Sequence, residues 1–342
     1  MIDVIFTVDY EIYGNGEGSL RELVYERGEK LKPVFQKWNA RCVVFVEAAE
    51  FEIIGSERTD PAINLVERQI REFHGEGFEI GLHLHPQWYN AEYGNGSWHL
   101  DYGEYNLCRL SPDRIDQIID RSIAYLRKVL AAPGFCPLSF RAGNWLLQPT
   151  RTVSKALAEK GIKIDSSVFK GGVQHRQKMN YRRALKNGYF WPFSDNVNVP
   201  DSCGALIEFP IYTRMRPIWS LFSSKRIGLQ KKSELNKKDG DARFGRVRDY
   251  LRIRYPMKFD FCRMSITELT QIIEEEIRKD QKDPGILRPL IAIGHTKDLV
   301  DITTVEALLS LLQEKGIKVT SFRDLYNSKE ILGAWESERG IL

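Results

Sequence analysis

The sequence predicts an α/β fold built around a parallel β-sheet, either open or closed into a barrel. Short apolar runs rich in β-branched residues alternate with longer amphipathic stretches along the 342 residues of the chain. Most of the short runs are apolar at nearly every position, which is typical of strands buried on both faces of a parallel sheet. Such strands alternating with helices indicate successive βαβ units.

The short apolar runs predict eight strands: Val4–Val8, Cys42–Glu47, Phe78–His83, Leu138–Arg141, Ile162–Asp165, Leu206–Ile211, Leu290–Gly294 and Lys318–Ser321. The helical periodicity predicts six helices: Leu20–Trp38, Ala62–His74, Pro112–Leu130, Thr150–Glu159, Ser265–Lys279 and Thr304–Lys315. One helix start is clearly marked, because the hydroxyl of Ser111 can cap a helix that has Pro112 at its first position.

Three long segments, at about 86–110, 170–204 and 213–258, interrupt this alternation. The first is rich in Trp, Tyr, Gly and Asn, and the other two are basic and aromatic. Loops of this length in a compact domain are commonly functional. We therefore predict one domain over residues 1–342, with these segments as insertions that shape a groove.

The net charge of +4 is unevenly distributed along the chain. Residues 213–258 carry 14 Lys and Arg against 4 Asp and Glu, so the rest of the chain is acidic. A basic insertion on an acidic body indicates a surface that meets anions. A solvated loop without a ligand is the alternative interpretation.

The five cysteines are widely spaced and include no CxxC pair, which favours reduced thiols over a disulfide framework or a zinc knuckle. The N-terminal residues lack the pattern of a signal peptide, and no apolar stretch approaches the roughly 20 residues that cross a bilayer. We expect a cytoplasmic protein without a transmembrane segment, and the sequence makes no prediction of its oligomeric state.

Ionisable side chains follow the ends of two predicted strands. Asp9 and Glu11 end the first strand, and His83 and His85 end the third. Residues two apart in an extended segment point to the same side. Since the carboxyl ends of parallel strands meet at one edge of a sheet, these four side chains are expected to lie close together. Two imidazoles and a carboxylate are a usual ligand set for a catalytic divalent metal.

Three further candidates lie at other strand ends: Arg141, Asp165 and His295. Each has an ordinary structural explanation when taken alone. An aspartate can cap a turn, an arginine can belong to an ion pair, and a histidine can be a hydrogen-bonded core residue. Together with the ends of the first and third strands, they place ionisable residues at five strand ends, which favours an active site.

The same motifs resemble those of the polysaccharide deacetylases, the NodB-homology group that forms carbohydrate esterase family four. The matching segments cover nearly the whole chain and are Thr7-Val8-Asp9-Tyr10-Glu11, Glu79-Ile80-Gly81-Leu82-His83, Ser139-Phe140-Arg141-Ala142-Gly143-Asn144, Gly161–Ser167, Leu206–Pro210 and Ile293-Gly294-His295. The resemblance implies a distorted (β/α) barrel of about seven to eight repeats, and a hydrolase that removes an N-acyl group from a sugar.

The resemblance also implies roles for four residues. Asp9 would be the base that takes a proton from water, and Arg141 would keep it ionised and aimed. A charged His295 would protonate the leaving amine, which needs a proton donor because it is a poor leaving group. Asp165 would orient His295 or Arg141.

The implied metal site comprises Glu11, His83 and His85, holding Zn²⁺ or else Co²⁺, Ni²⁺ or Mn²⁺. The family usually spaces its two histidines by three residues, but here that position is Gln87. Hence His85, Gln87 or water must complete the site. A second departure is Gly143, where the family usually has proline.

The implied substrate is an N-acylated sugar or glycan precursor, which could be anionic or phosphorylated, on a route to a surface polysaccharide such as O-antigen. Asn144, Trp145 and Trp88 are expected to contact it, with a backbone N–H near Asn144 stabilising the oxyanion. The aromatic residues of 86–110 could stack on sugar rings or form a small satellite core.

Three other functions remain as alternatives. They are a non-catalytic carbohydrate-binding relative, a metal-dependent amidohydrolase acting on a non-sugar amide, and nucleic-acid binding by the arginines of residues 243–254. No nucleic-acid fold signature accompanies those arginines, so we expect no nucleic-acid partner.

Overall fold

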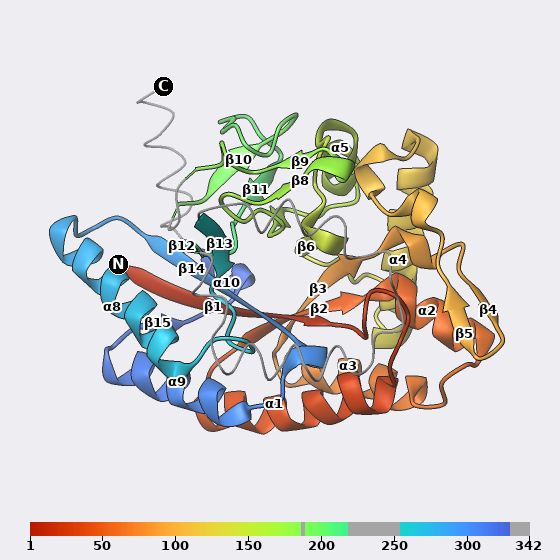
Figure 1. Ribbon diagram of the computed structural model, residues 1–342, viewed down its shortest axis with the longest axis horizontal. Coiled ribbons are helices and arrows are strands. Elements are labelled where there is room, and N and C mark those ends of the chain that lie inside the picture. The colour runs from red at the N-terminus through yellow and green to blue at the C-terminus, as the bar shows by residue number, and fades with distance from the viewer. Residues whose placement is uncertain (186–188, 218–253, 329–342) are drawn as a thin grey trace.

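The computed structural model describes residues 1–185, 189–217 and 254–328. A curved sheet forms its centre (Figure 1). Eight strands follow one another across it in the order β10 (Trp191–Phe193), β11 (Leu206–Glu208), β7 (Ile164–Asp165), β6 (Ser139–Ala142), β3 (Glu79–Leu84), β2 (Cys42–Glu47), β1 (Ile2–Tyr10) and β14 (Arg288–His295). β15 (Lys318–Val319) also pairs with β1, and every pair in the sheet is parallel except β10 with β11.

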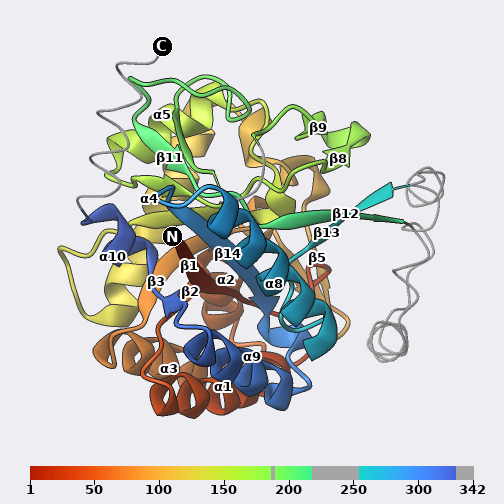
Figure 2. The same ribbon diagram turned by 90° about the vertical axis from the view of Figure 1, so that its left-hand side faces the viewer.

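Helices surround this sheet (Figures 1 and 2). They are α1 (Glu26–Lys37), α2 (Ala48–Glu57), α3 (Ile63–Gly75), α4 (Pro112–Leu130), α5 (Arg151–Glu159), α8 (Ile266–Lys282), α9 (Ile302–Glu314) and α10 (Phe322–Tyr326). A π-helical turn, η1 (Arg21–Tyr25), leads into α1, and single 3₁₀ turns η2 (Pro86–Trp88), η3 (Tyr102–Glu104), η4 (Leu107–Arg109), η5 (Gly143–Trp145), η6 (His175–Gln177) and η8 (Thr296–Asp298) lie in the connections. None of the helices described here is long and apolar enough to cross a membrane.

Hydrogen-bonded caps fix where several of these helices begin. The hydroxyl of Ser111 accepts from the backbone N–H of Arg114 at the start of α4, as the sequence predicts. At the start of α8, Ser265 and Glu268 form a reciprocal capping box. These caps satisfy N–H groups that have no partner within the first turn of a helix.

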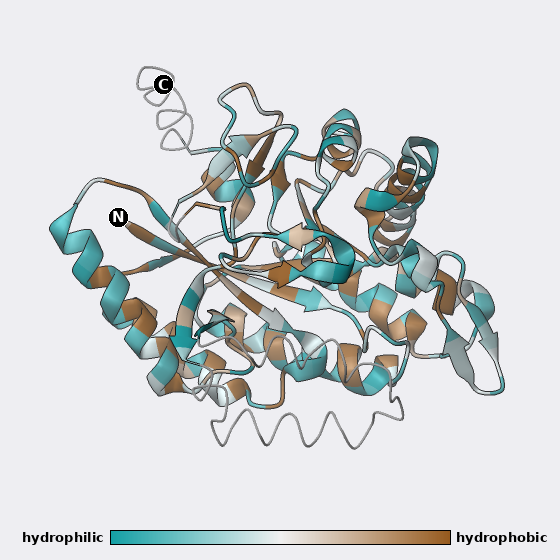
Figure 3. Ribbon diagram, turned by 45° about the horizontal axis from the view of Figure 1, so that its top comes forward, coloured by the Kyte–Doolittle hydropathy of each residue, from teal (hydrophilic) through white to brown (hydrophobic). Residues whose placement is uncertain are grey.

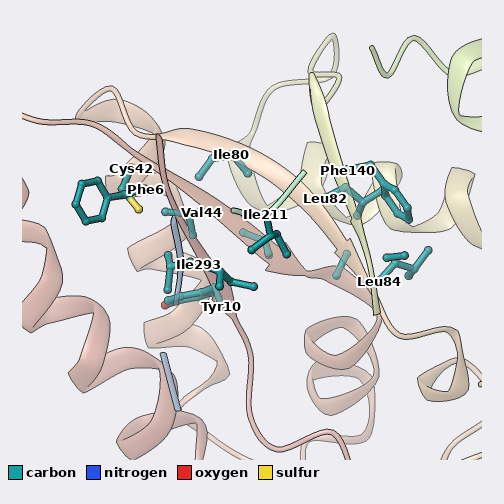
Figure 4. Packing of buried hydrophobic residues seen from close by; sticks show 14 of the residues in the cluster. Phe6, Tyr10, Cys42, Val44, Ile80, Leu82, Leu84, Phe140, Ile211 and Ile293 are labelled. Carbon is teal, nitrogen blue, oxygen red and sulfur yellow. The ribbon is translucent and has the colours of Figure 1, made fainter. Parts of the chain in front are cut away.

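The alternation of side chains along the strands gives the sheet two different faces. Val4, Phe6 and Val8 of β1 belong to the large core cluster that the surrounding helices complete, on the face we call the outer face. Figure 4 shows Phe6 with other members of this cluster, and Figure 3 shows the hydropathy of the strands and helices. Ile5 belongs to a second cluster, on the inner face, which α10 helps to fill. Further along β1, Thr7 and Asp9 share the inner face with Ile5 because they lie two and four residues beyond it.

The predicted α/β class is confirmed, and the sheet curls into half of a barrel. Its ladder of paired strands does not close within the described residues. Isolated bridges join Ile211 to Ile291 and Asp260 to Ile293 between its two ends. The five cysteines are free, as expected.

Each of the three insertions contains a hairpin. They contain β4 (Glu92–Gly94) with β5 (Ser97–His99), β8 (Val173–Gln174) with β9 (Met179–Asn180), and β12 (Thr213–Pro217) with β13 (Arg254–Lys258). Most of the basic insertion, including all of the arginine-rich residues 243–254 except Arg254, lies outside the described residues. The predictions made for that segment are therefore not examined by this structure.

Candidate functional site

Strand register brings the predicted site residues to one edge of the inner face. In the β1–β14 ladder Asp9 lies opposite His295, and in the β3–β6 ladder His83 lies opposite Arg141. In the β2–β3 ladder Glu47 lies opposite His83, so it shares the same face. Directly paired residues on parallel strands point to the same side, and each of these five side chains is therefore held by a strand end.

Asp9 lies between a guanidinium and an imidazole. Nη1 of Arg141 donates to Oδ1 of Asp9 at 2.6 Å, and Nε2 of His295 lies 3.3 Å from Oδ2. Burial alone would raise the pKa of Asp9, but Arg141 outweighs it, with help from His83 and His295, and the pKa is lowered. Asp9 is thus an ionised carboxylate at neutral pH, as a base must be.

Arg141 is itself rigidly held. Its side chain is fully buried, Nη2 donates to Oγ1 of Thr7 at 2.9 Å and to Oγ of Ser166 at 3.1 Å, and Nε donates to the carbonyl of Ser166 at 2.9 Å. The guanidinium therefore contacts β1 and the residue after β7 at once. This fixes the orientation of the carboxylate that it holds.

Glu11 has one occupied and one free oxygen. Nζ of Lys297 donates to Oε1 at 2.6 Å, and together with the imidazoles it lowers the pKa of Glu11 well below the usual range, against the effect of burial. Oε2 is buried and has no hydrogen-bond partner among the described residues. It lies 3.4 Å from Nε2 of His83 and 3.4 Å from Nδ1 of His85.

Both imidazoles are oriented by acceptors. Nδ1 of His83 lies 2.8 Å from the carbonyl of Arg141, and Nδ1 of His85 lies 2.7 Å from Oε2 of Glu47. In His83 a hydrogen on Nδ1 leaves the lone pair of Nε2, the nitrogen that faces Glu11, free for a ligand. In His85 the nitrogen near Glu11 is Nδ1, which also contacts Glu47. A carboxylate or carbonyl behind an imidazole is the usual support of a metal-binding histidine.

These residues fit a divalent cation. Glu11, Glu47, His83 and His85 are all buried, and each offers a ligand atom within 4.8 Å of the others. The unpartnered Oε2 of Glu11 is the observation that tests this fit, because a buried carboxylate oxygen without a donor is costly unless a cation satisfies it. In Gln87 too, both polar side-chain atoms are buried without a partner among the described residues.

The electrostatics of the cluster also favour positive charge. Burial lowers the pKa of His83, but the carboxylates of Asp9 and Glu11 outweigh burial and raise it to about 9. His83 thus keeps a proton at neutral pH. A metal ion at the same place could neutralise the carboxylates of Asp9 and Glu11 instead. Metal binding at such a site releases protons.

Gly143 provides the space that His85 occupies. A Cβ added at residue 143 would lie 2.6 Å from Cδ2 of His85 and 2.6 Å from the carbonyl oxygen of Leu84. The two departures from the family pattern are therefore linked in space, since the second imidazole two residues after the first packs against the glycine.

Asp165 lies elsewhere than expected. In the sheet it pairs with Phe140 and not with Arg141, so it points to the opposite face. Its carboxylate accepts from the backbone N–H and the hydroxyl of Ser167, and within the described part of the chain it forms no ion pair with His295 or Arg141. Asp165 therefore does not orient either cation, contrary to the expectation from the sequence. The next residue, Ser166, contacts Arg141 instead.

The protonation state of His295 also differs from the charged form that was expected. Burial lowers its pKa, although Asp9 acts in the opposite direction, so the neutral imidazole is favoured at neutral pH. Its Nδ1 lies 3.7 Å from Oδ2 of Asp298, which is ion-paired to Arg263. Asp298 is therefore the second carboxylate beside His295.

The three expected substrate contacts divide into two groups. Asn144 and Trp145 lie in a sharp left-handed turn after β6, with φ of 53° and 61°, and the ring of Trp145 lies 6.0 Å from that of His295. Trp88, by contrast, is fully buried and packs edge to face against Trp98. It cannot stack on a sugar, which favours the satellite-core interpretation for this part of 86–110.

Sequence reasoning missed four residues near the site: Glu47, Lys297, Asp298 and Lys258. Glu47 ends a predicted strand at the same edge as His83, so the rule that selected the other carboxylates would also have selected it. Lys297 and Asp298 follow His295 directly. Lys258 lies in the basic insertion, and no pattern in the sequence distinguishes it from its neighbours.

Solved structures with the same fold align over nearly the whole chain. A Mycobacterium smegmatis protein assigned as a polysaccharide deacetylase aligns over 95% of this chain and 88% of its own, with 14% identity and a TM-score of 0.52. GH57-type branching enzymes from Pyrococcus horikoshii and Thermococcus kodakaraensis align over 95% of this chain and 70% and 71% of their own, with 11% and 12% identity and TM-scores of 0.55 and 0.53.

No protein-family model matches the chain, and no curated protein is detectably similar to it in sequence. At these identities the structural likeness establishes the fold. The predicted resemblance to polysaccharide deacetylases is thus confirmed for the fold, which the branching enzymes share.

Proposed function

We propose that this protein is a metal-dependent deacetylase of the polysaccharide deacetylase type, which hydrolyses the N-acyl group, in the first instance N-acetyl, of a sugar. The observation that carries the proposal is the position of the buried, unpartnered Oε2 of Glu11 beside His83 and His85, next to the Arg141–Asp9–His295 array. The isolated bridges of Ile211 and Asp260 to β14 support the distorted barrel expected of this type.

Glu11, His83 and His85 would hold the ion, with Glu47 and Lys297 orienting the ligands. Two imidazoles and one carboxylate suit Zn²⁺. A bound divalent ion would supply acidity to the attacking water and stabilise the developing oxyanion.

The proton route follows from the geometry of Asp9. Ionised Asp9 accepts a proton as the water oxygen attacks the acyl carbon. Nε2 of His295 lies 3.3 Å from Oδ2 of Asp9, so this proton can pass to the neutral imidazole. His295 then donates it to the nitrogen as the C–N bond breaks, giving a free amine and a carboxylic acid.

The shared fold leaves glycosidic chemistry as the rival function. Glycosidases require a carboxylic acid with a raised pKa to protonate the leaving oxygen. The pKa values of Asp9 and Glu11 are both lowered, by Arg141 and Lys297 respectively. The proton donor at this edge is an imidazole, which favours amide hydrolysis.

Substitution tests the proposal on the zinc-loaded protein with a panel of N-acetyl sugars. Asp9→Asn and His295→Ala should each lower the deacetylation rate by roughly 10²–10⁴-fold, the usual effect of losing a general base or acid, while zinc stays bound. Glu11→Ala should lose zinc, measured by elemental analysis. His99→Ala, which removes an exposed histidine, is the control. Full activity in Asp9→Asn, or full zinc content in Glu11→Ala, would contradict the assigned role.

A further inference from the structure

Lys258 is carried to the active-site edge by the β12–β13 hairpin. It is the last residue of β13 and pairs with Thr213 of β12. Figure 2 shows these two strands side by side. The next residue, Phe259, donates its N–H to the carbonyl of Tyr212 at 2.8 Å and accepts from the N–H of Ile293 at 2.9 Å. Since Ile293 lies two residues before His295 on β14, these bonds fix Lys258 beside the strand that carries His295.

The ammonium group of Lys258 lies against two aromatic rings. Its Nζ is 3.3 Å from the ring centroid of Trp145 and 4.2 Å from that of Phe169. The ring of Trp145 is in turn 6.0 Å from the imidazole of His295. One indole therefore contacts both the lysine and the proposed proton donor.

Lys258 is half-buried without a counter-ion. Within the described residues it forms no ion pair and no hydrogen bond, whereas Lys297 at the same site is paired with Glu11. Burial, with Arg263 and Arg141 nearby, outweighs the attraction of Asp260 and Asp9 and lowers the pKa of Lys258 to about 7. Contact with aromatic faces compensates only in part for the lost hydration of an ammonium group.

We propose that Lys258 binds an anionic substituent, a carboxylate or a phosphate, on the sugar whose N-acyl group is hydrolysed. This inference rests on the proposed function and specifies its substrate class. An anion would supply the missing counter-charge. Nδ2 of Asn144, a buried donor without a partner among the described residues, lies one residue before Trp145 in the chain.

Binding of sugars that carry no amide tests the inference separately from hydrolysis. Calorimetry with glucose, glucuronate and glucose 6-phosphate compares the wild type with Lys258→Met and Lys258→Arg. Lys258→Met should weaken binding of at least one anionic sugar by about 10- to 100-fold, as loss of a buried charge-assisted contact does, and Lys258→Arg should restore much of it. Comparing glucuronate with glucose 6-phosphate identifies the anion. Lys155→Met, which removes an exposed lysine on α5, is the control.

A pH series distinguishes ligand binding from a structural role of the lysine. In the wild type the affinity for the anionic sugar should fall as the pH rises above about 7, because the free ammonium then loses its proton. Lys258→Arg should not show this fall, since a guanidinium stays charged. The same affinity for the anionic sugars in wild type and Lys258→Met would overturn the inference.

Turnover completes the test. The ratio of kcat/KM for N-acetylglucosamine 6-phosphate, or for N-acetylglucosaminuronic acid, to that for N-acetylglucosamine should fall in Lys258→Met, mainly through KM. Hydrolysis with an unchanged ratio would overturn the inference and leave the proposed function standing. Lysine-dependent binding of an anionic sugar without hydrolysis in any protein variant would overturn the proposed function and leave the anion-binding role of Lys258 standing.

Discussion

At the scale of single residues, the face of the sheet on which a side chain lies determines what it can do. Asp165 and Ser166 are neighbours, yet only Ser166 reaches Arg141. Asp165 instead lies beside Glu208, its partner in the β7–β11 ladder. In an extended chain a shift of one residue exchanges the two faces.

Gly143 shows how one missing side chain permits an unusual ligand spacing. The ring of His85 lies where a Cβ of residue 143 would be. We expect Gly143→Ala to displace His85 and weaken zinc binding about 10- to 100-fold, the usual effect of disturbing the support of a metal ligand. Competition with a zinc-selective chelator measures this. Gly134→Ala is the control, because a Cβ there meets no atom within 4 Å, and equal zinc affinity in the two variants would refute the steric argument.

At the scale of elements, strand positions were predictable and the start of α2 was not. The apolar runs locate β1, β2, β3, β6, β7, β11 and β14 to within a few residues of their observed bounds. Helix α2 escaped prediction because it is short and buried on most sides, and because its cap is Glu47, an unusual residue for that position. The same carboxylate supports His85 and caps the helix, so the site and α2 depend on each other.

The capping box of α8 offers a prediction at this scale. Oγ of Ser265 accepts from the N–H of Glu268, and Oε2 of Glu268 accepts from the N–H of Ser265 at 2.8 Å. We expect Ser265→Ala to lower the free energy of unfolding by about 1 kcal/mol. Denaturant titration measures the change. Ser265→Asp keeps an acceptor at the N-cap and should retain most of the stability; a loss equal to that of Ser265→Ala would contradict the capping explanation.

At the scale of the whole molecule, the inner face combines an apolar floor with an ionised edge. Ile5, Phe45 and Ile291 fill its lower part, while Asp9 lies at the carboxyl end of β1 and His83 at the carboxyl end of β3. The sequence predicted this edge, because strand ends can be recognised from apolar runs. It could not predict Lys258, whose position depends on a hairpin formed across a long insertion.

The stability of the sheet should depend on pH through one buried carboxyl pair, Asp165 and Glu208. Burial and the neighbouring Asp165 raise the pKa of Glu208 well above its usual value, and Oε2 of Glu208 can be satisfied only when it carries a proton that it donates to Asp165. Folding therefore favours the protonated form. The stabilisation that Glu208 contributes is complete below about pH 4.5, the pKa of an ordinary glutamate. It is lost as the pH rises towards the raised pKa of Glu208 in the folded protein.

Glu208→Gln should remove this dependence. The amide keeps an acceptor for the N–H of Val168 and a donor for Asp165, and it does not titrate. We expect the difference in Tm between Glu208→Gln and the wild type to become more positive from pH 5 to pH 8, measured by thermal unfolding. Glu314→Gln, at an exposed site, should follow the wild type. A constant difference across the series would show that Glu208 is ionised in the folded protein.

The pairing of β1 with β14 has a consequence for the newly synthesised chain. Glu11 and Lys297 are separated by 286 residues in the chain, and Asp9 meets His295 and Glu11 meets Lys297 only when β14 is in place. A nascent polypeptide emerging from the ribosome, with its first strands already folded, therefore lacks both the ammonium partner of Glu11 and the imidazole proposed as the proton donor. Catalytic competence should arise late in translation and all at once, when the penultimate strand of the main sheet docks.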